Sequence, residues 1–538
     1  MKLTLNDITG NASEWKAAGV KLPEFDVANV VANTKANPTW IHFGAGNIFR
    51  GFVAELQQVV LDKGEADTGI IAADTFDYEI IDKIYNPFDN LTLFVGLKPD
   101  GNTENKIIAS VCEALHANCD EAESFARMKE IFSNKGLQMV SFTITEKGYS
   151  LYNMNGELLP VVIDDIECGP DKPKHAMSVV TAMLYERFNN GAAPVALVSM
   201  DNCSHNGEKL YESVSKIATA WKEKGYVTDS FIEYINDESK VSFPWSMIDK
   251  ITPRPAKVIE DMLGEKGIED MIPVTTSRGT YIAPFVNAEI PQYLVIEDKF
   301  PNGRPRLELA GVYFTDRDTV NDTERMKVTT CLNPLHTALA VYGCLLGYTS
   351  ISAEMKDESL KKLVEHIGYD EGIPVVTDPG ILSPMDFIKE VIDERLPNPF
   401  VPDMPQRIAT DTSQKVPVRF GETIKSYIES DALDVTTLTY IPLAIAGWLR
   451  YLLAIDDNGN NMELSSDPML NELQKALEGI TFGQPETVGD KLSYILSNSN
   501  LFGTDLCAAG LSDKITDMFT KMIAGPGAVR ETLDCYVK

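Results

Sequence analysis

One segment, Thr323–Tyr348, contains residues whose types and spacing suit alcohol oxidation. Glu324 and Lys327 lie one helical turn apart, and Asn333 and His336 lie one turn apart at the start of an apolar run. Interconversion of an alcohol and a ketone needs a base for the hydroxyl proton and donors that polarise the carbonyl oxygen. A buried lysine can be that base, and amides are suitable neutral donors. From spacing alone, the alternative of an exposed Glu–Lys pair with a core histidine stays open.

A second segment, Ile41–Phe52, has the pattern of a phosphate-binding turn. It predicts a short strand, a turn that contains Gly44 and Gly46, and a helix that begins near Asn47. Such a turn directs backbone N–H groups and the positive end of a helix toward a pyrophosphate. The usual fingerprint has a third small residue where this chain has Phe49, so a turn without a ligand is an alternative.

Asp74 follows the next predicted strand, Thr68–Ala73, about thirty residues after the glycine turn. An acid at this place accepts hydrogen bonds from the adenosine ribose and repels a 2′-phosphate. No basic residue lies between Ala72 and Ile81. We therefore expect NAD rather than NADP. A capping role for Asp74 in the following helix is compatible with this one.

The elements that must position these residues differ between the two halves of the chain. Short apolar runs alternate with helical patterns in the first half, which predicts a doubly wound α/β sheet. The expected strands are Trp40–Phe43, Thr68–Ala73, Leu91–Leu97, Met139–Ile144, Val195–Ser199 and Gln292–Glu297. The expected helices between them are Asn47–Asp62, Asp120–Phe132, Ala176–Phe188 and Gly207–Lys222.

After the turn-rich segment Phe300–Arg304, helical patterns dominate. They cover Thr329–Leu346, Ala353–His366, Pro384–Glu394, Phe420–Ile428, Leu438–Leu453, Met469–Leu477, Gly489–Leu496 and Asp513–Met522. We therefore predict an N-terminal Rossmann-type domain for NAD at residues 1–305. A mostly α-helical domain for substrate binding and catalysis is expected at residues 306–538.

Composition excludes several classes of partner. A net charge of −31 disfavours nucleic acid and anionic membrane surfaces. The two most apolar stretches, Thr329–Ile351 and Ile441–Ile455, contain polar residues and are expected to be buried helices. Eight scattered cysteines and the lack of a targeting segment favour a cytoplasmic enzyme. The six histidines show no metal-binding spacing, so we expect no metal. The oligomeric state cannot be inferred.

Six segments, in order along the chain, are similar to motifs of the polyol-specific long-chain dehydrogenases, the mannitol dehydrogenase family. They are HFGAGNIFR at 42–50, FTITEKGY at 142–149, SMDNCSHNGE at 199–208, SMIDKITPRP at 246–255, EDKFPNGRP at 297–305, and ERMK with LNPLH at 324–336. The chain is identified on these motifs as a member of the family. It resembles most closely the branch that acts on sugar acids.

The resemblance implies a role for each matched residue. Lys327 would be the general base, and Glu324 would relay its proton to solvent. Asn202 and Asn333 would form the oxyanion pocket. The remaining implied roles are a substrate hydroxyl contact for His336, positioning for Asp249, substrate binding for Arg407 and Lys415, and cofactor binding for Gly44, Gly46, Asn47, Arg50, Asp74 and Glu146. For Asp249, Arg407 and Lys415, structural ion pairing is an alternative.

The match departs from the family pattern at two places. Asn333 lies six positions after Lys327, where the family leads us to expect five. One extra helical residue would turn Lys327 about 100° away from Asn333. We therefore expect a π-bulge or a helix break near Thr329–Cys331, unless the alignment of Lys327 is wrong. Lys250 stands where the family commonly has arginine, which removes bidentate geometry.

The expected activity is NAD-dependent, metal-free interconversion of D-mannonate and D-fructuronate with a lysine base. Arg407, Lys415 and Arg419 lie within thirteen positions and supply positive charge for a carboxylate in an acidic protein. The alternatives within the family are mannitol 2-dehydrogenase and tagaturonate reductase, and therefore a neutral polyol or another sugar acid as substrate. An alternative of another class is a non-catalytic redox sensor that binds a dinucleotide.

Overall fold

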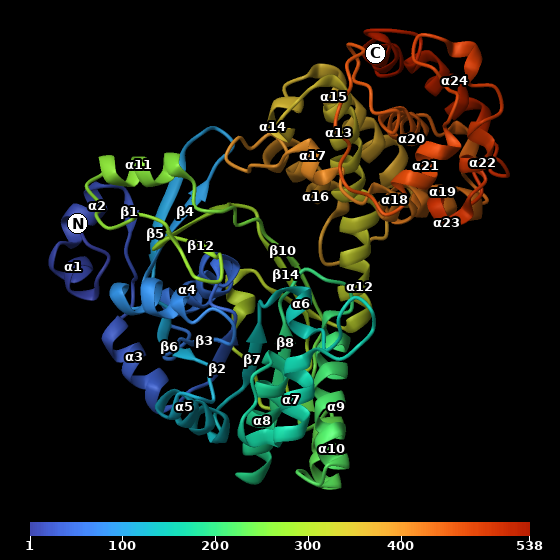
Figure 1. The fold of residues 1–538 in the computed structure, drawn as a ribbon. Helices are drawn as coiled ribbons and strands as arrows, with labels where there is room; N and C mark the ends of the chain where they lie inside the picture. Colours follow the sequence, from blue (N-terminus) through green and yellow to red (C-terminus); the bar gives the residue numbers. More distant parts are fainter. The chain divides into compact units, whose positions relative to one another are not determined.

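A computed structural model describes residues 1–538, which divide into two compact units. The first unit comprises Met1–Leu97 and Asn102–Val320, and the second comprises Asn321–Lys538 with the short stretch Lys98–Gly101. The predicted functional division after residue 305 stays a prediction. Figure 1 shows the helices and strands of both units.

The first unit contains a six-stranded parallel sheet in the order β6-β3-β2-β7-β8-β9. Its strands are β2 (Trp40–Phe43), β3 (Ile70–Asp74), β6 (Val111–His116), β7 (Met139–Phe142), β8 (Val195–Ser199) and β9 (Val241–Ser242). The chain runs outward from β2 to β6, returns to β7 beside β2, and then runs outward to β9. Ligands of doubly wound sheets bind at such a reversal point, outside the carboxyl ends of the strands.

Alternation of side chains along the central strands explains the two covered faces. Ile41 and Phe43 of β2 belong to the hydrophobic cluster on one face, and Trp40 belongs to the cluster on the other. In β3, Ile71 belongs to the same cluster as Ile41, and Ile70 belongs to the same cluster as Trp40. Strands buried on both faces read as continuous apolar runs, which is why the sequence predicted them.

Two predicted strands form but belong to other sheets, which corrects the expected sheet membership. Residues 91–97 yield β4 in a four-stranded sheet, and residues 292–297 yield β14 in a three-stranded sheet. The first sheet has the order β1-β5-β4-β13: β1 (Val20–Lys21), β5 (Thr103–Ile108), β4 (Thr92–Leu97) and β13 (Phe285–Glu289). The others contain β10 (Ser246–Asp249), β14 (Tyr293–Glu297) and β15 (Tyr313–Thr315), and β11 (Val274–Thr275) with β12 (Tyr281–Ile282).

Helices of the first unit connect and cover these strands (Figure 1). They are α1 (Leu5–Gly10), α2 (Ala12–Ala17), α3 (Val27–Ala36), α4 (Ala54–Asp62), α5 (Ala122–Ser133), α6 (Thr145–Tyr149), α7 (Pro160–Cys168), α8 (Ala176–Asn189), α9 (Asn206–Glu223), α10 (Asp229–Asn236) and α11 (Lys257–Glu265). Helix α12 (Arg317–Met326) contains the boundary between the units.

The second unit is helical, as predicted. Its helices are α13 (Asn333–Leu346), α14 (Ile351–Glu354), α15 (Glu358–Glu365), α16 (Pro384–Glu390), α17 (Pro405–Ile408), α18 (Thr412–Val416), α19 (Glu422–Glu429), α20 (Tyr440–Tyr451), α21 (Leu470–Ala476), α22 (Leu492–Leu496), α23 (Ser499–Phe502), α24 (Ser512–Met522) and α25 (Ala528–Tyr536). Helices α13 and α20 pack together at its core, where the Tyr342 hydroxyl donates to the Leu443 carbonyl at 2.9 Å. The two most apolar stretches are therefore buried helices, as expected. No helix has the length and apolar character that crossing a bilayer requires.

Candidate active site

The glycine turn after β2 has the geometry that the sequence predicts. Gly44 has φ +102°, a value that side chains disfavour, and a Cβ there would lie 2.2 Å from the Thr143 carbonyl oxygen. The backbone at Gly44 therefore lies directly against the end of β7. A helix begins at Asn47 and becomes a π-helical turn, η1, at Phe49–Val53.

Phe49 occupies the place of the expected third small residue because the helix is locally wider. Its buried ring stacks on His42 of β2, with ring centres 4.1 Å apart and planes 9° apart. The His42 nitrogens contact the hydroxyls of Ser141 and Thr143 at 2.6 and 2.8 Å. Burial lowers the pKa of His42 to about 3, so this ring is neutral and structural. An aromatic pair here replaces the close glycine contact between helix and strand.

The start of this helix leaves polar groups available to a ligand. The first N–H groups of any helix lack intrahelical acceptors and carry the positive end of the helix dipole. Asn47 starts the helix, and its buried Oδ1 has no hydrogen-bond partner but, as an acceptor, does not suit a pyrophosphate oxygen. Gly44 and Gly46 line a cavity of about 960 Å³ in front of these groups. Such an arrangement fits the pyrophosphate of a dinucleotide.

Arg50 has a different role from the one implied by the motif. The residue is fully buried, and its guanidinium donates to Thr92 Oγ1 and to the carbonyls of Ala283 and Pro284 at 2.8–3.1 Å. These acceptors tie η1 to β4 and to the segment before β13. Arg50 therefore supports the turn from behind, and the cofactor role implied for it gains no support from its position.

Asp74 lies at the end of β3 and in the wall of the same cavity. Its carboxylate accepts from the backbone N–H groups of Ala45, Phe76 and Asp77 at 2.8–3.1 Å. It therefore both fixes the glycine turn and caps the following turn, the two roles considered from the sequence. Burial raises the pKa of Asp74, and the three N–H groups partly oppose that shift.

The cavity wall also contains a basic residue that the sequence analysis missed. Arg278 reaches it from the hairpin of β11 and β12, and its guanidinium lies 5.0 Å from the centre of the Phe76 ring. The hairpin is held beside the carboxyl end of β3 because Thr276 donates to Asp77 at 2.6 Å. About two hundred residues separate the two segments, so no local pattern could have revealed this contact.

Glu146 is exposed on α6 and pairs with Lys209. Its neighbours Thr145 and Lys147 line the cavity, whereas Glu146 does not. The cofactor role implied for Glu146 therefore gains no support from its position.

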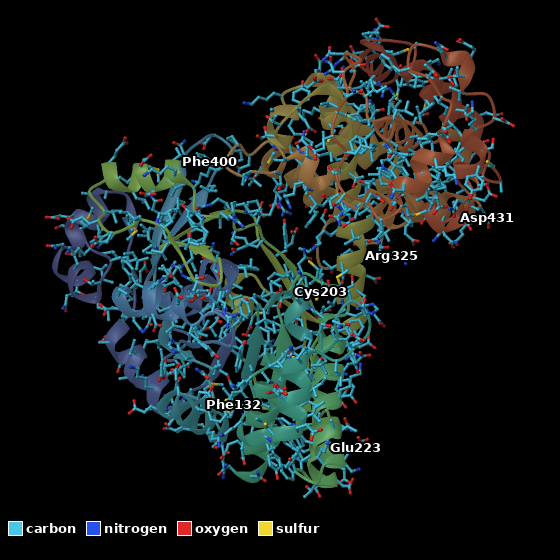
Figure 2. All side chains as sticks on the ribbon, viewed as in Figure 1. Phe132, Cys203, Glu223, Arg325, Phe400 and Asp431 are labelled. Atoms are coloured by element: carbon cyan, nitrogen blue, oxygen red, sulfur yellow. The ribbon has the colours of Figure 1, made fainter.

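The loop after β8 carries Asn202, which is exposed and adjoins Cys203 (Figure 2). The neighbouring residue Asp201 fixes this loop against the end of β7. Its carboxylate accepts from the N–H groups of Ile144 and Thr145 at 2.9 and 3.0 Å and from the Tyr149 hydroxyl at 2.6 Å.

Asn206 attaches the same loop to β10. Its amide donates to the carbonyls of Ser199, Asp201 and Ser246, and its oxygen accepts from the Ser246 N–H at 3.0 Å. Asn202 and the strand that ends in Asp249 are thereby held in one framework. Neither Asp201 nor Asn206 was predicted as a site residue, although both lie in the motif at 199–208.

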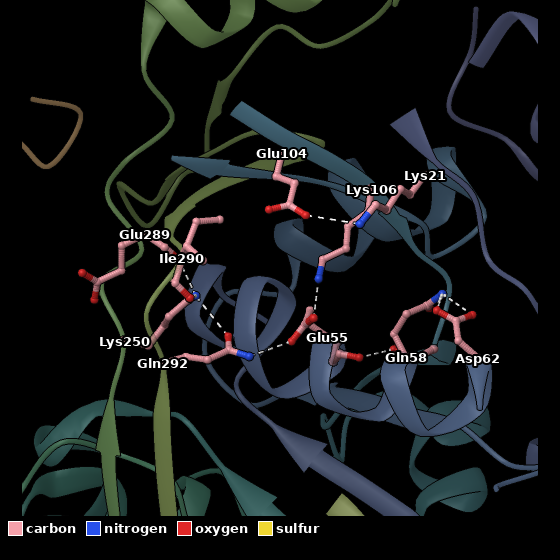
Figure 3. A network of polar contacts seen from close by, with 12 residues as sticks. Lys21, Glu55, Gln58, Asp62, Glu104, Lys106, Lys250, Glu289, Ile290 and Gln292 are labelled. Carbon is pink, nitrogen blue, oxygen red and sulfur yellow. Dashed lines mark hydrogen bonds and ion pairs between the residues drawn. The ribbon is translucent and has the colours of Figure 1, made fainter. Parts of the chain in front are cut away.

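Asp249 is the last residue of β10 and is buried. The next residue, Lys250, donates to the carbonyls of Glu289 and Ile290 and to Gln292 Oε1 (Figure 3). Gln292 in turn donates to Glu55 at 3.1 Å. Lys250 therefore anchors the end of β10 to the loop before β14, a point-charge role that does not need the bidentate geometry of arginine.

In the second unit, Lys327 is 3% exposed and opens a π-helical turn, η6, at Lys327–Cys331. The Leu332 N–H donates to the Lys327 carbonyl at 3.1 Å, five positions back rather than four. The Thr329 hydroxyl donates to the Arg325 carbonyl at 2.8 Å. A π-bulge is one residue inserted into an α-helix, so it absorbs the extra position before Asn333. The structure thus has both of the expected irregularities, a π turn and then a break at Leu332, whose φ of −129° and ψ of −60° are not helical.

Asn333 begins α13, and His336 lies one turn later on the same face. His336 Nε2 lies 3.3 Å from Asp403 Oδ2, and the same carboxylate pairs with Arg407. Burial of the Asp403 carboxyl opposes ionisation, but His336 and Arg407 outweigh burial and lower its pKa. Asp403 was not predicted. Its spacing of four residues before Arg407 is the local signal that could have revealed it.

The predicted basic residues Arg407 and Lys415 lie in one region with Arg419. Arg407 is 63% exposed, and its visible partner is Asp403. The Lys415 amine donates to the carbonyls of Ile408 and Thr410. Burial and the charges of Arg419 and Arg407 lower the pKa of Lys415 to about 8. Four of the expected groups, His336, Arg407, Lys415 and Asn333, thus belong to one framework in the second unit.

No three His, Cys, Asp or Glu side chains gather in a way that could hold a metal ion. The expectation that the reaction needs no metal stays a prediction. The first unit thus brings together the cofactor turn, Asp74, Asn202 and Asp249, and the second brings together Glu324, Lys327, Asn333 and His336.

Comparison with known proteins gives the family. Residues 38–309 match the mannitol dehydrogenase Rossmann domain, and residues 319–523 match the mannitol dehydrogenase C-terminal domain. The chain is 55% identical to a D-mannonate oxidoreductase of Thermotoga maritima, over 99% of this chain and 98% of that protein.

Two solved structures share the fold over nearly the whole chain. A Pseudomonas fluorescens mannitol 2-dehydrogenase, in a ternary complex with NAD and D-mannitol, has a TM-score of 0.68 and 25% identity, with 99% of both chains covered. A substrate-free D-sorbitol dehydrogenase has a TM-score of 0.78 and 24% identity, over 96% of this chain and 98% of that one. The chain is an oxidoreductase that belongs to the mannitol dehydrogenase family.

Proposed function

We propose that this enzyme interconverts D-mannonate and D-fructuronate with NAD as the cofactor. The observation that carries the proposal is the basic region of Arg407, Lys415 and Arg419 in the unit that contains His336. A protein with a net charge of −31 repels anions unless a local group of cations binds them. The 55% identity to a protein named D-mannonate oxidoreductase supports the same substrate.

The proposed roles follow from the chemistry of each group. A bound nicotinamide accepts or returns the hydride. Buried Lys327 takes the proton from the substrate hydroxyl as the general base. Glu324, one turn earlier and partly exposed, passes that proton to solvent. Asn202 and Asn333 donate hydrogen bonds to the oxygen as it gains negative charge.

Other groups orient the substrate in this proposal. His336 binds a hydroxyl group, and its Nε2 lies 3.3 Å from the Asp403 carboxylate without a formed hydrogen bond. Asp249 positions the groups at the end of β10. Arg407 and Lys415 supply positive charge at the far end of the substrate. This division of tasks needs no Lewis acid, because the amine is the base and the amides stabilise the alkoxide.

A substrate panel tests the proposal. With saturating NADH, we expect kcat/KM for fructuronate to exceed that for fructose by about ten- to a hundredfold, the value of one charged hydrogen bond to the carboxylate. Equal values for the two would favour mannitol 2-dehydrogenase, the activity named for the Pseudomonas fluorescens structure. Faster reduction of tagaturonate would favour tagaturonate reductase. No turnover with any of them would favour a redox sensor.

The cofactor preference is tested at Asp74. We expect kcat/KM to be at least about tenfold higher with NAD than with NADP, because a carboxylate repels a 2′-phosphate. Asp74→Ala should narrow that ratio, since Arg278 beside Phe76 then meets the phosphate unopposed.

The control for this experiment is the double variant with Arg278→Ala. It should lose the gained NADP activity and keep the NAD activity that the Asp74→Ala single variant has. Equal use of both cofactors by the wild-type enzyme would contradict the role of Asp74.

A further inference from the structure

We propose that Arg419 is the residue that binds the substrate carboxylate, by two parallel hydrogen bonds from its guanidinium. The inference rests on the proposed function and names the specificity determinant within it. Arg407, the sequence-based candidate, already holds an anion of the protein, the Asp403 carboxylate.

Arg419 is partly exposed, and its guanidinium contacts differ from those of the fully buried Arg50, Arg187 and Arg450. Arg187 donates to five backbone carbonyls, Arg450 donates to three, and Arg50 donates to two carbonyls and a hydroxyl. Arg419 has a single hydrogen bond, from Nη1 to Thr337 Oγ1 at 2.7 Å, and no carboxylate within ion-pair distance. A partly buried charge without a carboxylate partner is costly, so this guanidinium is poised for an anionic ligand.

The single contact places Arg419 at the catalytic segment. Thr337 follows His336 directly, and its hydroxyl donates to the Asn333 carbonyl at 3.0 Å. Because that hydroxyl proton is committed to Asn333, its oxygen is oriented to accept from Arg419. The hydrogen bond therefore ties the guanidinium to α13 at the residue after His336, whose proposed partner is a substrate hydroxyl.

Electrostatics reinforce the placement. Burial lowers the pKa of Arg419 to about 10, which leaves it charged at neutral pH. The charge of nearby Arg419 contributes to lowering the pKa of Lys415 to about 8. Asp403 offsets the charge of Arg407, whereas no acid offsets that of Arg419. A substrate carboxylate therefore has its most favourable electrostatic interaction with Arg419, and Lys415 is the second cation near it.

The chemistry of a guanidinium explains the selectivity. Its fork matches the two oxygens of a carboxylate, and each charged hydrogen bond is stronger than a neutral one. The terminal hydroxymethyl group of a neutral ketose offers one oxygen and no charge. Arg419 should thus distinguish a sugar acid from a sugar of similar shape.

The test compares fructuronate with fructose for the wild-type enzyme and for Arg419→Gln. We expect the ratio of the two kcat/KM values to fall by about ten- to a hundredfold, mainly through a higher KM for the acid. Activity on fructose should change little. The ratio for Arg419→Lys should lie between those of the wild-type enzyme and Arg419→Gln, because lysine keeps the charge but cannot form two parallel hydrogen bonds. Lys425→Gln, which removes a charge from the neighbouring ion pair with Glu422, should keep the wild-type ratio.

Thermal unfolding separates a ligand-binding role from a structural one. Arg419→Met should leave Tm unchanged or raise it, because it removes an uncompensated charge. Arg187→Met should lower Tm, because it leaves five carbonyls without their donor.

The possible failures can be told apart. A wild-type enzyme without preference for the acid would overturn the proposed function and this inference together. A preference that survives in Arg419→Gln would overturn the inference alone. A fall in Tm for Arg419→Met as large as for Arg187→Met, with the ratio unchanged, would show that Arg419 is structural.

Discussion

Replacing Lys327 with alanine should lower kcat by about a hundred- to ten-thousandfold, the usual contribution of a positioned general base. The side chain is buried at the start of η6, and nothing else in the catalytic segment offers a neutral amine. Substrate oxidation at saturation measures the loss. Binding of NADH, followed by its fluorescence, should stay nearly unchanged, because the glycine turn and Asp74 belong to the other unit.

The pH dependence provides an independent readout for Lys327. Only the neutral amine accepts a proton, so wild-type oxidation should rise with pH until the lysine is deprotonated. Lys327→Ala should lose this limb of the profile. Glu324→Gln serves as the matched control, because it removes the proposed relay and keeps the base, and it should slow oxidation less. If Lys327→Ala keeps a tenth of wild-type activity, the π turn does not restore the family alignment and another residue is the base.

The central sheet could be predicted because its strands are buried on both faces. Trp40–Phe43 and Val195–Ser199 are continuous apolar runs, and the structure has β2 and β8 at the same bounds. Residues 91–97 and 292–297 have the same local character, yet they pair in other sheets. An apolar run specifies that a strand is buried, whereas its partner is chosen by contacts distant in sequence.

The catalytic segment was predictable for a different reason. Its motif identifies the residue types. The count of six positions between Lys327 and Asn333 indicated a π-bulge or a helix break there, unless the alignment of Lys327 was wrong. Asp403 and Arg278 were not predictable in this way. Each reaches its neighbours through tertiary packing, Asp403 at His336 and Arg278 at the ring of Phe76.

Arg50 shows how little a position within a motif says about the direction of a side chain. It lies within the cofactor motif, and arginine often binds phosphate, so the sequence implied a ligand. The π turn η1 carries it to the inner face of the helix, where it meets backbone carbonyls. Position within a motif specifies proximity to a site, whereas the direction of the side chain depends on the local helix geometry.

Asn333→Ala should lower kcat by about a hundred- to a thousandfold, the usual cost of removing one oxyanion donor. The amide acts on the charge that develops in the transition state, so KM should change little. If both amides serve the same oxygen, as proposed, the double variant with Asn202→Ala should lose less than the product of the two single losses.

Asn333 also begins a helix, so stability must be measured beside activity. Asn498→Ala is the matched control, since Asn498 accepts from the N–H groups of Asn500 and Leu501 at the start of α23. It should cost about 1 kcal/mol of unfolding free energy and leave kcat unchanged. The Asn333 side chain caps no helix in this way. Asn333→Ala should therefore have the opposite effect from Asn498→Ala: kcat should fall and Tm should stay unchanged. A lower Tm with normal kcat would make Asn333 a structural residue and leave Asn202 as the proposed oxyanion donor.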